Sequence, residues 1–458
     1  MKTIDRRQFL RQSVAAAAIA ATPGAAYTQM AGGSGAFDDY RALVCVFLHG
    51  GNDSFNMLVP RSTAEYNAYA TSRQNLAIPR DDLLPINPLS QPGTPGNEPF
   101  GLHPTMGGLQ ALFQSGQVAF VSNVGPLIEP TSLDQYRNKS VLLPPQLFSH
   151  NDQQDQWASL KGRSTSKTGW AGRMADLIRA EVPNQQMAIN ASLHGSNLFQ
   201  SAEQTFPYVM GAGGPQEFQW LGWWLQDQQI RHRAAFEAIV DARYDSIYER
   251  GFAEIQRRAI DAAATVTAAM ATPEAQAVTT PFPRTELGTQ LNTVARIIAA
   301  RNYLQMQRQV FFVGMGGFDT HDDQETVQPR LLMDINDALA AFHAATVEVG
   351  VASSVTTFTQ SDFGRTLTSN GDGTDHAWAG NQLVLGGAVN GRDIYGSYPV
   401  LEIGSAEDVG GGRMIPSTSA DQFAATLAKW FGVADSDLEI VAPSLTNFAQ
   451  RDLGFMIA

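Results

Sequence analysis

The sequence predicts an α/β protein with a mostly parallel central sheet and helices on both of its faces. Short, continuous apolar runs rich in β-branched residues alternate along the chain with longer segments of helical composition. Such runs are typical of parallel strands buried on both faces, and their alternation with helices is typical of β–α–β units. The chain has 458 residues, of which 43% are hydrophobic and 16% charged. These values exclude a disordered chain, a coiled coil and a collagen-like fibre.

Five apolar runs are expected to form the strands. The first ends at His49-Gly50-Gly51, which indicates a buried strand that leads into a tight loop. The five runs occupy residues 42–48, 117–124, 309–314, 355–359 and 382–385. Two segments rich in Pro and polar residues are expected to be loops, at 79–104 and 126–168. The second is long and is interpreted as a functional loop that contains short helices.

Three stretches have the composition or spacing of helices. Residues 220–270 are dominated by Glu, Arg, Ala and Gln, which predicts a helical insertion at about 215–275. Close to the C-terminus, Ser417 or Ser419 is expected to cap a helix that stops at Gly432. A further amphipathic helix is predicted by four apolar residues at helical spacing, which are Leu287, Leu291, Val294 and Ile298.

The first 26 residues have the form of a twin-arginine export signal. Arg6-Arg7 precedes an Ala-rich apolar run that is too short to span a bilayer. We therefore expect a signal at 1–26, a Gly/Ser-rich linker at 27–40 and a single α/β domain at 41–458. The expected location is periplasmic or secreted, reached through the twin-arginine export machinery, with no membrane span in the mature form. Because this route carries folded proteins, it favours a cofactor that is acquired inside the cell.

The charge and cysteine content exclude several kinds of site. The chain carries 31 Lys and Arg against 44 Asp and Glu, a net charge of −13. This acidity argues against a nucleic-acid partner, because phosphate binding needs clustered basic residues. Cys45 is the single cysteine, so an intramolecular disulfide and a thiolate metal cluster are both excluded.

Four of the eight histidines lie within four residues of an aspartate. The motifs are His49 with Asp53, His150 with Asp152, Asp319 with His321, and Asp375 with His376. Three of them follow predicted strands, at the sheet edge where α/β proteins bind ligands. Imidazole and carboxylate groups together suit Zn, Mn or Fe ions, whereas carboxylates alone would suit Ca.

The motifs predict a site for one or two divalent ions. Taken singly, each Asp could cap a turn and each His could bond a carboxylate. Their expected convergence at neighbouring strand ends favours metal binding. The candidate metal ligands are Asp53, Asp319, His321, Asp362, Asp375 and His376.

The order of motifs along the chain resembles DUF1501, an exported bacterial family of unknown function. That family is grouped with alkaline-phosphatase-like and sulfatase-like hydrolases. The motifs that carry the resemblance are FLHGGNDSFNMLVP (47–60), GLHPTM (101–106), SHNDQQDQW (149–157), TGWAGRM (168–174), GGFDTH (316–321), SDFGRT (361–366), GTDHAWAGNQLVLGGAV (373–389) and GRDIYGSYP (391–399).

The resemblance implies an alkaline-phosphatase-like fold and a metal site with a departure from the usual pattern. Asp53 matches the acidic residue that closes the first strand in the wider group, and Asp319 with His321 matches a later metal-binding pair. Phe363 stands where that group commonly has a histidine. Either a single ion or an altered pair is then implied, with Asp375 or His150 as the substitute ligand.

The group also implies a nucleophile at a helix start after the second strand. Ser149, next to His150, is the first candidate, and Thr131 or Ser132 follow, although all three could be ordinary loop hydroxyls. Cys45 lies inside the first strand, which argues against a modified-cysteine nucleophile. Arg365 is expected to hold an anionic group by bidentate hydrogen bonds, with a surface salt bridge as the alternative.

These observations predict an exported metal-dependent hydrolase of phosphate or sulfate esters. Its substrate would be a small anionic ester or a polysaccharide. The alternative is a non-catalytic exported protein that keeps the fold and binds a polysaccharide or a protein partner. A serine esterase is a weaker alternative, because His49-Gly50-Gly51 matches its oxyanion loop but no G-x-S-x-G nucleophile motif accompanies it.

Overall fold

A computed structural model describes residues 37–184, 187–216 and 226–457. The predicted signal at 1–26 lies outside the described residues, as do most of the predicted linker and residues 217–225. Among the residues that the structure describes, no helix is long and apolar enough to cross a lipid bilayer.

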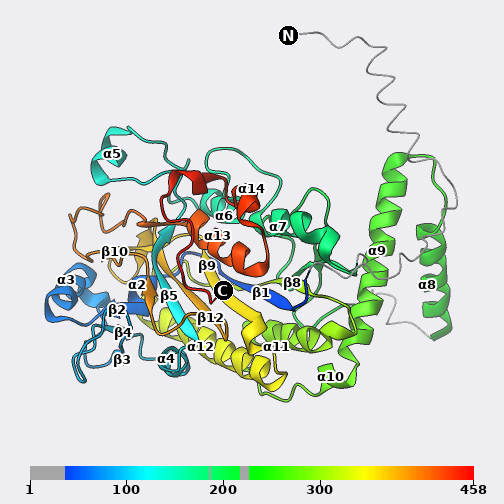
Figure 1. Ribbon diagram of the computed structural model, residues 1–458, viewed down its shortest axis with the longest axis horizontal. Helices are drawn as coiled ribbons and strands as arrows, with labels where there is room; N and C mark the ends of the chain where they lie inside the picture. The colour runs from blue at the N-terminus through cyan, green and yellow to red at the C-terminus, as the bar shows by residue number, and fades with distance from the viewer. Residues whose placement is uncertain (1–36, 185–186, 217–225, 458) are drawn as a thin grey trace, which may run out of the picture.

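Nine strands form the main sheet of this described part, and most neighbours run parallel (Figure 1). β12 (Gly380–Gly386) is antiparallel to the strands on both of its sides. The order across the sheet is β13 (Ile394–Tyr395), β5 (Val118–Gly125), β12, β9 (Val355–Ser361), β1 (Arg41–Leu48), β8 (Arg308–Met315), β6 (Asn190–Ser192) and β7 (Tyr208–Val209), with β14 (Thr418–Ser419) also paired to β5.

The five predicted apolar runs are confirmed as β1, β5, β8, β9 and β12. They read as continuous apolar segments because both faces of these strands are covered, and all residues of β5, β8, β9 and β12 are buried. β1 lies between β8 and β9, and Leu48 at its end pairs with Met315 and Ser361. The segments that follow β1, β8 and β9 therefore leave the sheet side by side, at the same edge.

Helices cover both faces of the sheet, so the predicted fold class is confirmed. In Figure 1 one layer contains α4 (Gly107–Gln114), α11 (Glu286–Ala299) and α12 (Gln324–Glu348). The opposite layer contains α7 (Trp170–Ile178), α13 (Ala420–Phe431) and α14 (Leu438–Val441). One hydrophobic cluster joins the strands to the helices of both layers, which makes the sheet and its covering helices a single core.

The predicted helix ends agree with the capping residues. Ser419 caps α13, and its side chain and that of Gln422 form a reciprocal capping box. Gly432 ends the same helix with φ of 117°, a conformation that favours glycine. The amphipathic spacing at 287–298 lies within α11, whose N-cap is Thr285.

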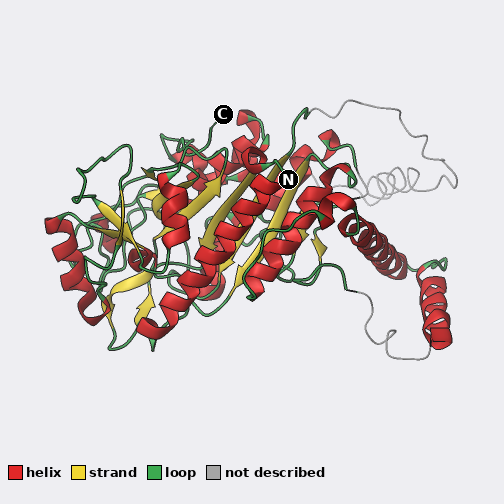
Figure 2. Cartoon of the chain, turned by 90° about the horizontal axis from the view of Figure 1, so that it is seen from below, coloured by secondary structure: helices red, strands yellow, loops and turns green. Residues whose placement is uncertain are grey.

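Two helices lie where the insertion at about 215–275 was predicted. α8 (Gln226–Val240) and α9 (Ile247–Met270) lie at one end of the molecule in Figure 1 and project away from the sheet and its covering helices (Figure 2). α10 (Pro273–Gln276) then leads back to α11. The limits assigned to the insertion and to the single domain stay predictions.

Residues 79–104 were wrongly expected to be loop throughout. They contain β3 (Leu84–Ile86) and β4 (Phe100–Leu102), which form a small antiparallel sheet with β2 (Leu58–Pro60). Three-residue strands among prolines leave no periodic signal, and pairing with β4 is what holds them. The long loop at 126–168 does contain short helices, α5 (Leu133–Asn138) and α6 (His150–Ser159).

Candidate metal centre

Three separate elements bring His150, Asp319 and His376 together. His150 is the first residue of α6, Asp319 follows β8, and His376 ends β11 (Thr374–His376). The His376 Nε2 lies 3.2 Å from Asp319 Oδ1, and the His150 Nε2 lies 3.4 Å from Asp319 Oδ2. One nitrogen or oxygen atom from each residue lies within 4.8 Å of the others, which is a spacing that a single ion could bridge.

His321 extends this group to a fourth side chain. Its Nε2 lies 3.1 Å from Asp319 Oδ1 and 2.9 Å from the Nε2 of His376. Two imidazole nitrogens that share an ion at about 2.1 Å lie about 3.0 Å apart in octahedral coordination and about 3.4 Å apart in tetrahedral coordination. The separation of His321 and His376 therefore suits two ligands of the same ion. We call His150, Asp319, His321 and His376 the histidine cluster.

Each imidazole of the histidine cluster has a contact at Nδ1, the ring nitrogen that does not face Asp319. Its Nδ1 lies close to an oxygen of another residue, which fixes the ring and turns Nε2 towards Asp319. The three contacts are His150 to Asp362 Oδ2 at 2.6 Å, His376 to the Phe148 carbonyl at 2.8 Å, and His321 to Asp375 Oδ1 at 3.3 Å. Partners of this kind on Nδ1 orient metal-binding histidines and raise their basicity.

Arg365 holds Asp319 in place. The guanidinium is fully buried, and its Nη1 donates to Asp319 Oδ1 at 2.7 Å and to the Gly50 carbonyl at 3.0 Å. Its other nitrogens donate to the side chain and carbonyl of Thr374. Burial opposes ionisation of Asp319, but the hydrogen bond and charge of Arg365, with His321 and His150, lower its pKa below 3.8. Asp319 is thus a carboxylate at neutral pH.

The position of Arg365 follows from local strand pairing. β10 (Arg365–Ser369) and β11 form an antiparallel hairpin in which Arg365 and His376 are direct partners. This hairpin lies between β9 and β12 in the sequence, so it is carried at the edge where β1, β8 and β9 end. The contacts of Arg365 within the chain are to Asp319, Gly50 and Thr374, and a contact with an anionic ligand stays a prediction.

Two glycines let the loop after β1 approach the site. Gly50 has φ of 116°, and a Cβ there would lie 2.3 Å from the backbone nitrogen of Asp319. Gly51 has φ of 89°, and a Cβ there would lie 2.4 Å from the ring of Phe363. The His49-Gly50-Gly51 segment therefore needs glycine at both positions for backbone and steric reasons.

Phe363 forms an apolar wall of the site. It is buried, and its ring centroid lies 4.8 Å from that of His150 and 4.6 Å from that of His376. Burial is also the main cause that lowers the pKa of His376, with help from the charges of His150 and Arg365. His376 is therefore neutral at neutral pH, as a metal ligand must be.

The donor set of the histidine cluster fits a divalent ion. Three imidazole nitrogens and one carboxylate suit Zn, Mn or Fe, and the rings are already oriented by their Nδ1 partners. A purely structural hydrogen-bond network would give each exposed Nε2 its own acceptor. Here the Nε2 atoms of His150, His321 and His376 all face one carboxylate instead.

Three of the predicted metal ligands lie outside this cluster. Asp53 is buried, and its carboxylate binds the guanidinium of Arg73 and the side-chain amide of Gln324. Asp362 and Asp375 reach the cluster through His150 and His321, as described above. The structure thus brings Asp319, His321 and His376 together with His150, and it does not bring Asp53 among them. Direct metal binding by Asp53, Asp362 and Asp375 stays a prediction.

The candidate nucleophiles have different surroundings. Ser149 lies at the N-cap of α6, and its hydroxyl donates to Asp152 Oδ2 at 2.6 Å. Thr131 donates to the Glu129 carbonyl, and Ser132 caps α5. Cys45 is buried inside β1, and burial raises the pKa of its thiol, so it lies away from any exposed reactive position.

Sequence reasoning missed two neighbours of the cluster. Gln154 donates from Nε2 to Asp362 Oδ2 at 2.9 Å. Its spacing of four residues from His150 on one helix was a usable signal. The carbonyl of Phe148 also binds His376, but Phe148 has φ of 72°, an unusual conformation for a bulky residue that no sequence motif announces.

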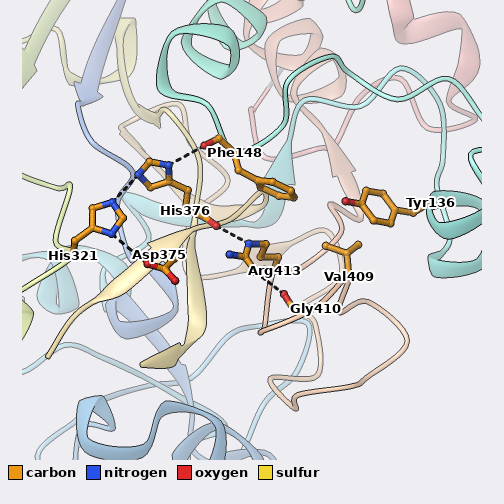
Figure 3. Close-up of a pocket in the computed structure, with 8 residues that line it drawn as sticks. All are labelled: Tyr136, Phe148, His321, Asp375, His376, Val409, Gly410 and Arg413. Carbon is orange, nitrogen blue, oxygen red and sulfur yellow. Dashed lines mark hydrogen bonds and ion pairs between the residues drawn. The ribbon is translucent and has the colours of Figure 1, made fainter. Parts of the chain in front are cut away.

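A cavity of about 420 Å³ opens beside the cluster (Figure 3). His321, Asp375 and His376 form one side of it. The opposite sides come from the α5 region and from the loop before β14. The cavity gives a ligand access to the exposed face of the histidine cluster.

Comparisons with known proteins identify a family but no activity. A family model described as "Protein of unknown function (DUF1501)" matches residues 40–438. No curated protein matches the chain.

Solved structures with a similar arrangement include a sulfatase and a synthase. The chain is similar to the PsFucS1 sulfatase from Pseudoalteromonas sp., with 9% identity, a TM-score of 0.36, and coverage of 92% of this chain and 74% of the other. It is also similar to the lipoteichoic acid synthase LtaP from Listeria monocytogenes, with 8% identity, a TM-score of 0.34, and coverage of 87% and 73%. Values this low transfer neither an activity nor a site to this chain.

Proposed function

The chain belongs to the family of unknown function DUF1501, and we propose that it is an exported metal-dependent hydrolase of phosphate or sulfate esters. One observation carries the proposal. The Nε2 atoms of His150, His321 and His376 face a single carboxylate, Asp319, and each imidazole is held at Nδ1 by another oxygen. Metal-binding histidines are typically fixed in this way, with one ring nitrogen held by an oxygen and the other left to bind the ion.

A divalent ion in the histidine cluster would supply Lewis-acid stabilisation of the charge that develops on an ester oxygen. The protein's own residues have separate roles. Arg365 keeps Asp319 ionised and oriented, Asp362 orients His150, and Phe363 keeps water from the inner side of the rings. The donor set favours Zn, Mn or Fe over Ca.

Ser149 is the side chain that we propose as nucleophile. It precedes His150 and lies at the start of α6, where the helix dipole stabilises a developing negative charge. Attack by Ser149 Oγ would form a bond to phosphorus or sulfur while the bond to the ester oxygen breaks, and the hydroxyl proton of Ser149 would pass to Asp152 Oδ2. The leaving oxygen would keep the electron pair of the broken bond and take a proton from water. Hydrolysis of the resulting ester by water would restore the hydroxyl.

The test combines metal analysis with turnover. Protein purified without chelator should contain about one equivalent of Zn, Mn or Fe per chain, and should hydrolyse 4-nitrophenyl phosphate or 4-nitrophenyl sulfate. Dialysis against EDTA should remove both properties, and adding the metal back should restore them. Stoichiometric metal without turnover of either ester would favour the alternative, a binding protein that keeps the fold. Absence of metal would overturn both the site and the activity.

Ser149→Ala separates a serine nucleophile from direct attack by water. If Ser149 is the nucleophile, the variant loses turnover but keeps its metal. If water attacks the ester directly, turnover remains near that of the wild type. Ser62→Ala is the matched control, because Ser62 is the N-cap of α3 (Thr63–Arg73) and its hydroxyl also donates to a carboxylate three residues on, that of Glu65.

We also propose export through the twin-arginine machinery. The support is the Arg6-Arg7 motif ahead of the Ala-rich run in the sequence. Replacing both arginines by lysine should retain the protein in the cytoplasm, as measured by cell fractionation, while the wild-type chain reaches the periplasm or the medium. Unchanged distribution of the variant would contradict this route.

A further inference from the structure

The cavity beside the histidine cluster has walls of two kinds. One side presents the groups of the cluster, and the other presents an aromatic and cationic surface. Figure 3 shows Phe148 and Tyr136 along the upper side and Arg413 below Phe148. The remaining walls are Val409 and Gly410. Phe148 and Tyr136 line the same cavity as His376, so a group that extends outward from an ester bound at the cluster would enter the space beside them.

Arg413 is a cation without an acidic partner among the residues that the structure describes. Its Nε donates to the His376 carbonyl at 2.9 Å, and its Nη1 donates to the Gly410 carbonyl at 3.0 Å. Its Nη2 has no hydrogen-bond partner within the described ranges. Arg365, by contrast, is paired with Asp319. An unpaired guanidinium at a cavity wall is a ready site for an anion.

The loop that carries Arg413 is held rigidly. Asp408 is buried, and its Oδ1 accepts hydrogen bonds from the backbone nitrogens of Gly410, Gly412 and Arg413 at 2.7, 2.8 and 3.1 Å. Its Oδ2 accepts a bond from the backbone nitrogen of Gly404 at 2.9 Å. Asp408 thus fixes the loop, and its carboxylate oxygens bond to backbone nitrogens rather than to the guanidinium of Arg413.

The aromatic walls are also set in place. The guanidinium carbon of Arg413 lies 5.5 Å from the ring centroid of Phe148, within cation–π distance. Phe148 is held at positive φ while its carbonyl binds His376, and such strain is typical of residues at functional sites. The ring of Tyr136 packs on Trp378, and its hydroxyl has no hydrogen-bond partner in the described part of the chain.

We propose that this cavity binds the leaving group of the ester, and that the leaving group is a ring carrying an anionic substituent. The ring would lie against Phe148 and Tyr136, and Nη2 of Arg413 would hold the anion. The proposal rests on the proposed function for the identity of the reacting ester, but the recognition of an anionic ring can be measured separately. Arg413 would then determine the preference for an ester with an anionic leaving group over one with a neutral leaving group.

The chemistry of the walls excludes two simpler occupants. A neutral apolar ring would leave the unpaired guanidinium of Arg413 desolvated without compensation. A small inorganic anion would leave the aromatic walls unused and would not need a cavity of about 420 Å³. An anionic ring satisfies both surfaces, and a charge-assisted hydrogen bond gives a preference that is large enough to measure.

Two pairs of esters test the proposal. The probes are 4-carboxyphenyl phosphate against 4-carbamoylphenyl phosphate, and the two corresponding sulfates. The wild type should show a kcat/KM for the carboxylated ester about tenfold to hundredfold above that for the neutral one. Arg413→Met should bring this ratio close to one. Arg413→Lys should keep part of the preference, because it keeps the charge and loses the planar fork.

Controls separate recognition from damage to the site. Because Nε of Arg413 donates to the carbonyl of His376, the metal content of Arg413→Met has to be measured as well. We expect it to equal that of the wild type. Arg284→Met is the matched control, since Arg284 is exposed and does not line the cavity. It should leave the ratio of the two esters unchanged. An unchanged ratio in Arg413→Met, or no preference in the wild type, would overturn the proposal.

Product binding distinguishes failure of the cavity from failure of the reaction. Isothermal titration calorimetry compares 4-hydroxybenzoate with 4-hydroxybenzamide, which needs no turnover. If no ester is hydrolysed but 4-hydroxybenzoate binds at least tenfold more tightly and Arg413→Met removes that difference, the anionic-ring site stands and the proposed hydrolysis fails. If neither turnover nor selective binding is found, both proposals fail.

Discussion

Two aspartate–arginine pairs lie near the ends of neighbouring strands, and they serve different purposes. Asp53 follows β1 and pairs with Arg73, whereas Asp319 follows β8 and pairs with Arg365. Both guanidinium groups are fully buried. The Asp53 side chain is 1% exposed, but that of Asp319 is 46% exposed. The Asp53–Arg73 pair is therefore buried, and we call it the closed pair. The Asp319–Arg365 pair is accessible to a ligand, and we call it the open pair.

The surroundings of the two carboxylates explain this difference. The side chain of Gln324 and the guanidinium of Arg73 cover Asp53, and Gln328 binds its backbone carbonyl. Asp319 instead faces the three Nε2 atoms of the histidine cluster. A buried Asp–Arg pair alone is thus a structural element, and it becomes a candidate metal centre only where several imidazoles face an exposed carboxylate. Gln324 also accepts from the Thr374 hydroxyl, which connects the closed pair to Arg365.

The largest effect is expected at the open pair. Asp319→Asn keeps the shape of the side chain but removes the negative charge that the three imidazoles share. We expect metal binding and ester turnover to fall to background, beyond the loss of about 100-fold that is typical when an outer partner of a metal ligand is removed. Metal analysis and steady-state kinetics measure both. Asp322→Asn, at an exposed residue three positions on, is the matched control and should retain both properties. Full metal content in Asp319→Asn would show that the comparison between the pairs is wrong.

The closed pair should determine stability instead. Asp53→Ala leaves the buried Arg73 guanidinium without its counter-charge, which is expected to cost about 3–5 kcal/mol in the free energy of unfolding. Urea unfolding of the metal-loaded protein measures the loss. The double variant Asp53→Ala/Arg73→Met should recover part of it, because no unpaired charge remains. Loss of metal with unchanged unfolding free energy would instead make Asp53 a metal ligand, as its position after β1 predicts.

Much of the fold was readable because burial leaves a simple signature. β1 and β8 are continuous apolar runs since helices cover both faces of the sheet. Direction was not readable: β12 has the same apolar composition as its neighbours but runs antiparallel to them. β6 was missed because a three-residue strand of Asn, Ala and Ser has no apolar run.

The site was readable only in part. Asp319 and His376 could be proposed because each lies close to a strand end within a compact Asp/His motif. Asp53 has the same signature, and nothing in the sequence indicates that Arg73, twenty residues later at the end of α3 (Thr63–Arg73), returns to neutralise it. Arg413 was not proposed at all, since its place opposite the cluster depends on a loop that Asp408 folds.

The stability of the part of the protein around the Asp53–Arg73 pair should also depend on pH. His103 follows β4 and is 6% exposed, and burial lowers its pKa from 6.5 to about 4 against the opposing charge of Asp53. Between these values the folded state binds fewer protons than the unfolded state, so stability falls as pH falls from 6.5 to 4. The expected contribution is about 3 kcal/mol. His103→Gln should lose this share of the pH dependence in urea unfolding at pH 7 and pH 4. His232→Gln, at an exposed position of α8, should retain it.

The smallest effect is expected at Asp362, and it distinguishes residues that bind the metal from residues that only orient a metal ligand. Asp362 is fully buried and binds Nδ1 of His150 through Oδ2, while its Oδ1 has no hydrogen-bond partner in the part of the chain that the structure describes. If Asp362 only orients His150, Asp362→Asn should weaken metal binding by about tenfold, since the amide oxygen can still accept from the imidazole. Competition with a chelating dye measures this affinity. Gln154→Met, which removes the second contact to the same oxygen, should have a smaller effect. If Asp362→Asn loses as much metal affinity as Asp319→Asn, Oδ1 of Asp362 itself binds an ion. The metal site would then extend inward from Asp319 towards β9.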